Sequence, residues 1–140
     1  HVDTDQLRRS ADWVHDLIDR EIERGLPSER IMVAGFSQGG AVSFEAALTY
    51  PHRLAGIMAL STYFATASTV AVNPVQQALP MLICHGSEDP VVPESLGRQS
   101  VATLQKFGFN PEYLIYPMEH AVCPQQIVDM GGWIERTLKA

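Results

Sequence analysis

The sequence predicts an α/β fold in which a mostly parallel sheet of about four strands carries helices on both faces. Short apolar runs without polar alternation recur along the chain, as is typical of strands that are buried on both faces. Between these runs lie segments whose apolar residues return every three or four positions, as is typical of amphipathic helices. The regular exchange between the two patterns indicates successive βα units, which build parallel sheets.

The chain length indicates one domain over residues 1–140. Apolar residues make up 46% of the chain, which is enough to build a hydrophobic core. The 16 acidic residues outnumber the 10 basic ones, and this negative balance argues against nucleic acid as a partner. No apolar run reaches the roughly 18 residues of a membrane span. Because the first residues also differ from a signal peptide, we expect a cytoplasmic protein.

The first expected element is an amphipathic helix near the start of the chain. Its apolar face is predicted from five residues spaced by three or four positions, namely Leu7, Ala11, Val14, Ile18 and Ile22. Asp3 and Gln6 resemble a capping box at the beginning of this helix, and Gly25 is suited to its end. The apolar run over residues 31–34 then predicts the first strand.

The remaining elements follow the same two patterns. Further strands are expected over residues 54–60, 81–84 and 113–116. A helix over residues 39–50 is ended by Pro51, which cannot continue it. Two later helices are indicated by apolar faces made of Leu96, Val101, Leu104 and Phe107, and of Ile127, Met130, Ile134 and Leu138. Residues 62–79 show no clear period, and we expect so long a segment to line a pocket.

The strongest functional signal is Gly35-Phe36-Ser37-Gln38-Gly39, which matches the pattern G-x-S-x-G. A predicted strand leads into it and a predicted helix follows, and in that setting the serine occupies a sharp turn above the sheet's carboxyl edge. We expect side chains at Gly35 and Gly39 to collide with neighbouring elements. The N–H of Gln38 is predicted to donate to an oxyanion at the helix N-terminus. The alternative is an ordinary glycine-rich turn with a surface serine.

A serine hydroxyl needs a base to remove its proton, and the base needs a third group to orient it. The predicted strand 81–84 is followed by HGSEDP at residues 85–90, and the strand 113–116 is followed by PMEH. Both loops leave the sheet at the edge where Ser37 is expected. Asp89 and His120 are therefore the predicted acid and base, in the chain order that α/β enzymes of this kind use.

Other residues of the same types offer alternatives. Glu88 could replace Asp89 as the acid. His85 precedes the acid in the chain, so we interpret it as a structural residue that positions the Asp89 loop. His15 and His52 lie at or near predicted helices, and we expect both to face solvent.

The sequence contains no pattern that is typical of a metal or cofactor site. Cys84 lies within an apolar run and is interpreted as a buried apolar filler. A disulfide with Cys123 is conceivable, but nothing in the sequence requires one. No His, Cys and Asp residues have the spacing of a metal site, and neither G-x-G-x-x-G nor a P-loop is present.

Four segments carry a resemblance to a known family. They are residues 34–41 (AGFSQGGA), 60–63 (LSTY), 85–93 (HGSEDPVVP) and 116–120 (YPMEH). Together they resemble the carboxylesterase/acyl-protein thioesterase (phospholipase/carboxylesterase) family of α/β-hydrolases, and LSTY is most similar to its bacterial carboxylesterases. The resemblance implies Ser37 as nucleophile, Asp89 as acid, His120 as base and no cofactor. It also implies hydrolysis of short to medium acyl esters, with thioesters and lysophospholipids as substrates of some members.

One part of the family pattern has no counterpart before Asp3. Family members begin with further strands, one of which ends in a Leu-His-Gly loop that supplies a second oxyanion-hole amide. We therefore expect the C-terminal portion of an α/β-hydrolase domain, with an open apolar sheet edge that favours a homodimer. An oxyanion hole that lacks one donor typically loses about 100- to 1,000-fold in turnover.

The sequence thus predicts a serine carboxylesterase whose partner is a small acyl-ester substrate. His120 would act in its neutral form, so activity is expected to rise with pH. The alternative is a truncated, weakly active or inactive hydrolase fragment that associates through its exposed sheet edge.

Overall fold

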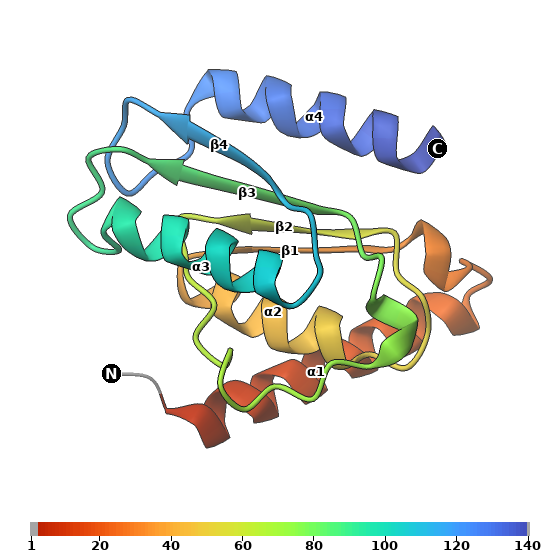
Figure 1. Cartoon of the computed structure of the whole chain (residues 1–140). Coiled ribbons are helices and arrows are strands. Elements are labelled where there is room, and N and C mark those ends of the chain that lie inside the picture. Colours follow the sequence, from red (N-terminus) through yellow and green to blue (C-terminus); the bar gives the residue numbers. More distant parts are fainter. Residues whose placement is uncertain (1–2, 140) are drawn as a thin grey trace.

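Four parallel strands form one sheet in the order β1-β2-β3-β4, in a computed structural model that describes residues 3–139 (Figure 1). They are β1 (Met32–Phe36), β2 (Gly56–Leu60), β3 (Met81–Gly86) and β4 (Glu112–Tyr116). The predicted parallel α/β sheet is therefore confirmed. β1 and β3 continue beyond their predicted apolar runs to Phe36 and Gly86. The segments that contain Ser37 and Asp89 therefore begin at the carboxyl ends of these strands.

Helices cover both faces of this sheet, as predicted. They are α1 (Thr4–Glu23), α2 (Gln38–Thr49), α3 (Glu94–Lys106) and α4 (Pro124–Lys139), with short 3-10 turns η1 (Ser28–Arg30) and η2 (Pro74–Gln76). Figure 1 shows α2 and α3 on one face, α4 on the other, and α1 packed against α2. The Asp3 side chain accepts the N–H of Gln6 at 3.1 Å, which confirms the predicted cap of α1. Within residues 3–139, no helix combines the length and the apolar character that a membrane span needs.

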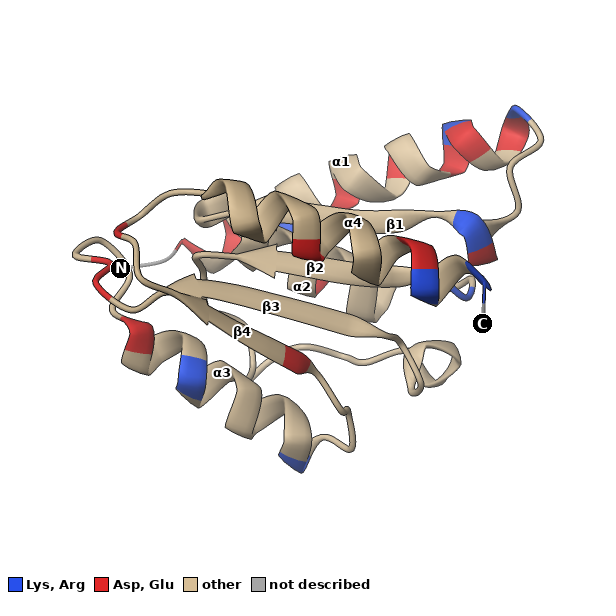
Figure 2. Ribbon diagram, turned by 90° about the horizontal axis from the view of Figure 1, so that it is seen from above, with Lys and Arg blue, Asp and Glu red and all other residues tan. Residues whose placement is uncertain are grey.

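The two central strands contribute alternate residues to two hydrophobic cores. Ile57 and Ile83 point toward α2 and α3, whereas Met58 and Leu82 point toward Trp133 of α4. Because both faces are covered, every residue of β2 and β3 is buried, which explains their unbroken apolar runs. Charged residues lie mainly on helices and loops, and of the four strands only β4 carries an Asp, Glu, Lys or Arg (Figure 2).

β1 lies at one edge of the sheet and pairs only with β2 among the described residues. Successive residues of a strand direct their backbone N–H and C=O groups to opposite sides. Because the N–H of Ser37 donates to Leu60 of β2, the backbone groups of Ala34, three residues earlier, face away from β2. Beside this edge, a groove of about 780 Å³ runs between α1 and β1. Trp13 and Leu17 line it with exposed apolar side chains. Within residues 3–139, β1 therefore has one unpaired edge beside apolar side chains, and the homodimer stays a prediction.

We predict that the chain self-associates through β1 and that Ala34→Lys weakens this association. Ala34 is exposed, and a lysine on an edge strand opposes pairing with another strand. Sedimentation velocity at rising protein concentration is expected to show dimers for the wild type and mainly monomers for the variant. Ile115→Lys, at an exposed position of the opposite edge strand β4, is the matched control and leaves the dimer unchanged. A wild-type chain that stays monomeric at every concentration contradicts the prediction.

Candidate active site

Ser37 occupies a sharp turn between β1 and α2. Its backbone has φ 56° and ψ −121°, a region that residues other than glycine rarely adopt. The Ser37 N–H donates to the Leu60 carbonyl at 2.8 Å, and the Ser37 carbonyl accepts from the N–H of Gly40 at 2.9 Å. These bonds hold the strained turn at the carboxyl end of β1, as the strand–turn–helix context of the motif predicts.

Close backbone approach explains two of the glycines around this turn. A Cβ at Gly35 would overlap the carbonyl oxygen of Gly39 and the hydroxyl of Ser43. A Cβ at Gly40 would come within 2.7 Å of the Thr62 Cβ. The prediction that Gly39 also needs a missing side chain is wrong, because nothing lies within 4 Å of a Cβ there. In the first turn of α2, Gly39 lines a cavity, whereas Gly40 lies against the side chain of Thr62.

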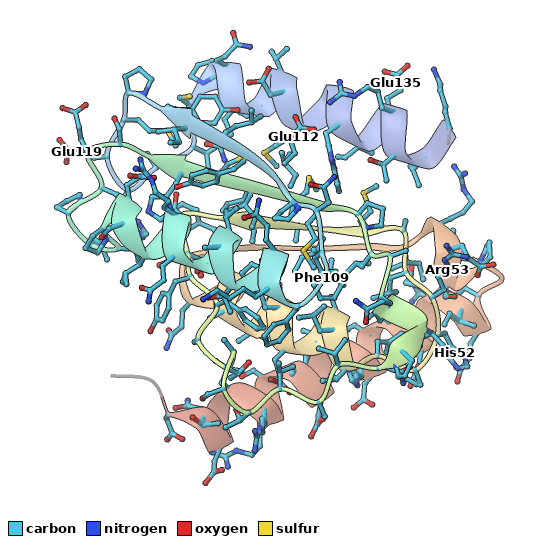
Figure 3. All side chains as sticks on the ribbon, viewed as in Figure 1. His52, Arg53, Phe109, Glu112, Glu119 and Glu135 are labelled. Carbon is cyan, nitrogen blue, oxygen red and sulfur yellow. The ribbon has the colours of Figure 1, made fainter. Side chains whose placement is uncertain are left out.

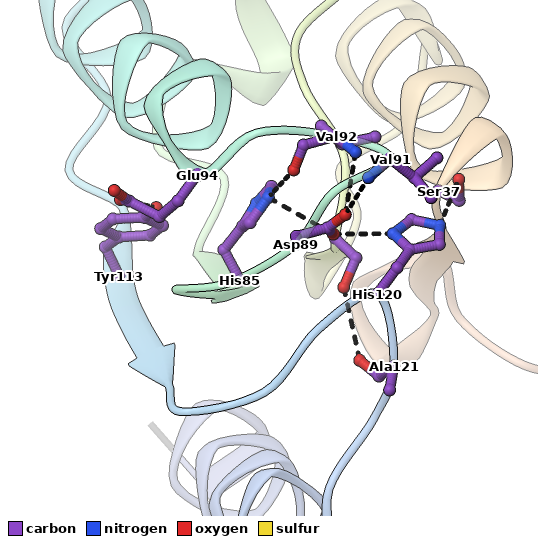
Figure 4. Close-up of polar contacts among 10 residues, drawn as sticks. Ser37, His85, Asp89, Val91, Val92, Glu94, Tyr113, His120 and Ala121 are labelled. Carbon is purple, nitrogen blue, oxygen red and sulfur yellow. Dashed lines mark hydrogen bonds and ion pairs between the residues drawn. The ribbon is translucent and has the colours of Figure 1, made fainter.

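The structure brings the three predicted residues of the site together. Ser37 Oγ lies 3.0 Å from His120 Nε2, and His120 Nδ1 lies 2.7 Å from Asp89 Oδ2 (Figure 4). An ionised carboxylate can only accept, so Nδ1 carries the proton and Nε2 is free to accept from the serine hydroxyl. The three side chains come from the loops after β1, β3 and β4. We refer to Ser37, His120 and Asp89 as the Ser–His–Asp cluster.

Backbone amides hold the buried end of this cluster. The Asp89 side chain is fully buried, and its Oδ1 accepts the N–H groups of Val91 at 2.8 Å and Val92 at 2.9 Å. Burial raises the pKa of Asp89, but the hydrogen bonds from His120, Val92 and Val91 outweigh it and keep the pKa below its usual value. The carboxylate therefore stays ionised. Glu88 is exposed, and it is Asp89 that contacts His120.

The other histidines occupy different environments. His85 is completely buried, and its Nε2 lies 2.7 Å from the carbonyl oxygen of Val92, in the loop it was expected to position. His52 is exposed, as predicted, and lies at the opposite end of the molecule from Glu119 (Figure 3). The prediction that His15 faces solvent is wrong. It is half-buried against α2, with Nε2 at 2.8 Å from the Ala46 carbonyl oxygen.

Cys84 packs as the predicted apolar filler, fully buried between the sheet and α4. Burial raises the pKa of its thiol to about 12, so it stays protonated at neutral pH. Cys84 and Cys123 are both free thiols, and no disulfide joins them.

Among residues 3–139, His, Cys, Asp and Glu side chains form no group of three or more that could hold a metal ion.

Phe36 is a contact residue that sequence reasoning missed. Its ring packs on the imidazole of His120, with 4.7 Å between ring centroids and 45° between ring planes. The only sequence signal was its place as the first variable residue of G-x-S-x-G. Such packing limits the rotation of the imidazole and covers one of its faces.

A cavity of about 350 Å³ opens at the serine and is called the site cavity here. Ser37 and Gln38 line it together with Thr62 and Tyr63. Of the segment 62–79, which was expected to line a pocket, Thr62 and Tyr63 thus line this one. Gln38 is the first residue of α2, and within residues 3–139 its backbone N–H donates to no protein oxygen. The larger groove between α1 and β1 is lined by none of the residues of the Ser–His–Asp cluster. The site cavity is therefore the candidate place for a substrate.

The arrangement of strands and helices is that of the α/β-hydrolases. SOBER1 of Arabidopsis thaliana superimposes with a TM-score of 0.90, at 27% identity, over 99% of this chain and 67% of that one. The Phospholipase/Carboxylesterase family model matches residues 1–138, so the chain belongs to this family. The family resemblance drawn from the four sequence segments is thereby confirmed.

Curated relatives carry names of ester and thioester hydrolases. The acyl-protein thioesterase 1 of Gibberella zeae is 36% identical over 97% of this chain and 60% of its own length. A probable carboxylesterase of Oryza sativa subsp. japonica is 34% identical over 99% of this chain and 53% of its own. The chain thus spans between one half and two thirds of these relatives. The preference for the bacterial branch stays a prediction.

We predict opposite outcomes for alanine at the two glycines of the motif. Gly35→Ala forces a methyl group into backbone atoms, and overpacking of this kind typically costs about 1–3 kcal/mol of unfolding free energy. Gly39→Ala meets open space within a helix, where alanine is favoured over glycine by up to about 1 kcal/mol. Urea unfolding followed by circular dichroism measures both. Equal destabilisation by the two variants contradicts the assignment of close contacts.

We predict that ionised Asp89 stabilises the folded chain. Because its pKa is lowered on folding, this contribution is complete above the ordinary aspartate pKa of about 3.9 and is lost as the pH falls through the lower folded value. The difference in unfolding free energy between the wild type and Asp89→Asn is therefore expected to be constant near neutral pH and to shrink in acid. Urea unfolding across the acidic range measures it.

The matched control for this titration is Glu88→Gln. Glu88 is exposed, so its replacement is expected to change stability by less than about 0.5 kcal/mol at any pH. A difference between wild type and Asp89→Asn that widens as the pH falls contradicts the depressed pKa.

Proposed function

We propose that this chain carries the nucleophile, base and acid of a serine hydrolase for carboxylic esters, with thioesters as related substrates. The observation that carries the proposal is the unbroken chain of hydrogen bonds from Ser37 through His120 to Asp89. Family membership and relatives named as a thioesterase and a carboxylesterase support it. These relatives do not favour the alternative of an inactive fragment.

In the first half of the reaction, Ser37 Oγ attacks the carbonyl carbon of the substrate. His120 Nε2 takes the hydroxyl proton as the new C–O bond forms, and the carbonyl oxygen becomes an oxyanion. The free N–H of Gln38, at the positive end of the α2 dipole, is placed to donate to that oxygen. The carboxylate of Asp89 stabilises the imidazolium and keeps its proton on Nδ1.

The second half releases both products. The bond between the carbonyl carbon and the leaving oxygen or sulfur breaks, and His120 gives its proton to the leaving group. Water then attacks the acyl-enzyme, with His120 taking one proton from it. Collapse of the second tetrahedral intermediate returns the proton to Ser37 Oγ and frees the carboxylic acid.

The size and lining of the site cavity support a small substrate. Its volume of about 350 Å³ lies at the low end of the range for small-molecule sites, which suits a short to medium acyl group. Among the described residues that line it, Asp3 is the one charged side chain, so none of these residues offers a cationic partner to an anionic group. In this proposal the N–H of Gln38 is an oxyanion donor, and removal of one such donor typically costs about 100- to 1,000-fold in turnover.

We predict that a fluorophosphonate probe labels the wild-type chain and fails to label Ser37→Ala. Phosphonylation requires the activated hydroxyl, so the mass increase of one probe group is expected in intact-protein mass spectrometry of the wild type only. Ser87→Ala removes an exposed serine from the loop before Asp89 and is the matched control, with labelling unchanged. Labelling that persists in Ser37→Ala refutes the nucleophile assignment.

A further inference from the structure

We propose that His85 is a positioning residue for this reaction, which fixes the backbone turn that orients the Asp89 carboxylate. The proposal rests on the function proposed for the Ser–His–Asp cluster and concerns a residue that takes part in none of the chemical steps. Figure 4 shows His85 on the far side of Asp89 from His120. It therefore reaches the reacting serine only through other groups.

The hydrogen bond of His85 has a defined direction. Its Nε2 lies 2.7 Å from the Val92 carbonyl oxygen, and a carbonyl can only accept, so Nε2 carries a proton and donates. The side chain is wholly buried, and Nδ1 has no hydrogen-bond partner among the described residues. A charged ring would leave a buried N–H at Nδ1 without an acceptor, so the environment fits a neutral ring.

Val92 connects His85 to the carboxylate. Its carbonyl accepts from His85, while its N–H donates to Asp89 Oδ1 at 2.9 Å, beside the N–H of Val91 at 2.8 Å. With Oδ1 held by two amides, the other oxygen is the one presented to His120, at 2.7 Å. The orientation of the carboxylate therefore depends on the turn over residues 89–92. His85 holds that turn through its hydrogen bond to the Val92 carbonyl.

The ring of His85 is itself fixed by close packing. A Cβ on Gly97 of α3 would come within 2.5 Å of Nδ1 and within 3.1 Å of the Tyr113 hydroxyl, so the helix backbone lies directly against the ring. Tyr113 on β4 donates in turn to Glu94 Oε2 at 2.6 Å. His85 Nε2 is 3.7 Å from Asp89 Oδ2, too far for a hydrogen bond, so it leaves that oxygen to His120.

Replacement by glutamine or asparagine separates this role from simple packing. Counted from Cβ, the amide nitrogen of glutamine falls at the position of histidine Nε2, whereas that of asparagine falls at the position of Nδ1. His85→Gln can therefore restore the donor to Val92, and His85→Asn cannot. His85→Leu keeps an apolar filler without any donor.

The test measures the second-order rate of fluorophosphonate labelling of Ser37 in all four chains. A misplacement of about 1 Å caused by a change away from the reacting atoms can cost about 100-fold in rate, and we expect losses of up to this order for His85→Leu and His85→Asn. His85→Gln is expected to return close to the wild-type rate. If His85→Leu does not fold, the glutamine and asparagine variants decide the matter.

A second readout does not depend on reactivity. The proton on His120 Nδ1, held by Asp89 at 2.7 Å, is expected to give a far-downfield NMR signal in the wild type and His85→Gln, weakened in the other two variants. Wild-type protein that shows the signal but never reacts with the probe refutes the proposed function and leaves the positioning role to the NMR comparison. Equal rates and equal signals in folded His85→Gln and His85→Asn overturn the positioning role.

Discussion

The hydrogen bond from His120 to the buried carboxylate of Asp89 is the contact on which the rest of the site depends. It decides which ring nitrogen carries the proton, and so leaves the other facing the Ser37 hydroxyl. A carboxylate out of contact with water would ordinarily take up a proton. The hydrogen bond from His120 and the amides of Val92 and Val91 replace the lost water and keep the pKa of Asp89 below its usual value, and Asp89 therefore remains an acceptor at neutral pH.

The parallel sheet makes that contact available to the serine. The carboxyl ends of parallel strands lie at one edge, so loops far apart in the sequence meet there, and the loops after β1, β3 and β4 supply one side chain each. Two cores, one on each face, hold β2 and β3 rigidly between them. The strained turn at Ser37 persists because this frame and its hydrogen bonds to Leu60 and Gly40 fix it.

The fold and the three cluster residues could be predicted because each depends on a short segment. An apolar run signals a buried strand, and G-x-S-x-G signals a turn whatever surrounds it. The meeting of the three loops followed from the common sheet edge at which parallel strands end, but contacts that depend on how individual side chains pack left no such signal. The neighbours of Gly39 and the burial of His15 depend on how α2 packs, and the stacking of Phe36 on His120 depends on two separate loops. The role of Val92 was hidden because backbone amides look alike in any sequence.

The most direct measurement of the central claim is a crystal structure of the chain after reaction with a dialkyl 4-nitrophenyl phosphate, which loses 4-nitrophenolate as the serine oxygen bonds to phosphorus. The account predicts phosphorus bonded to Ser37 Oγ, one phosphoryl oxygen within hydrogen-bond distance of the Gln38 N–H, and His120 still bound to Asp89. Phosphorus on another residue, or an imidazole that has left both Ser37 and Asp89 without a partner, would contradict it.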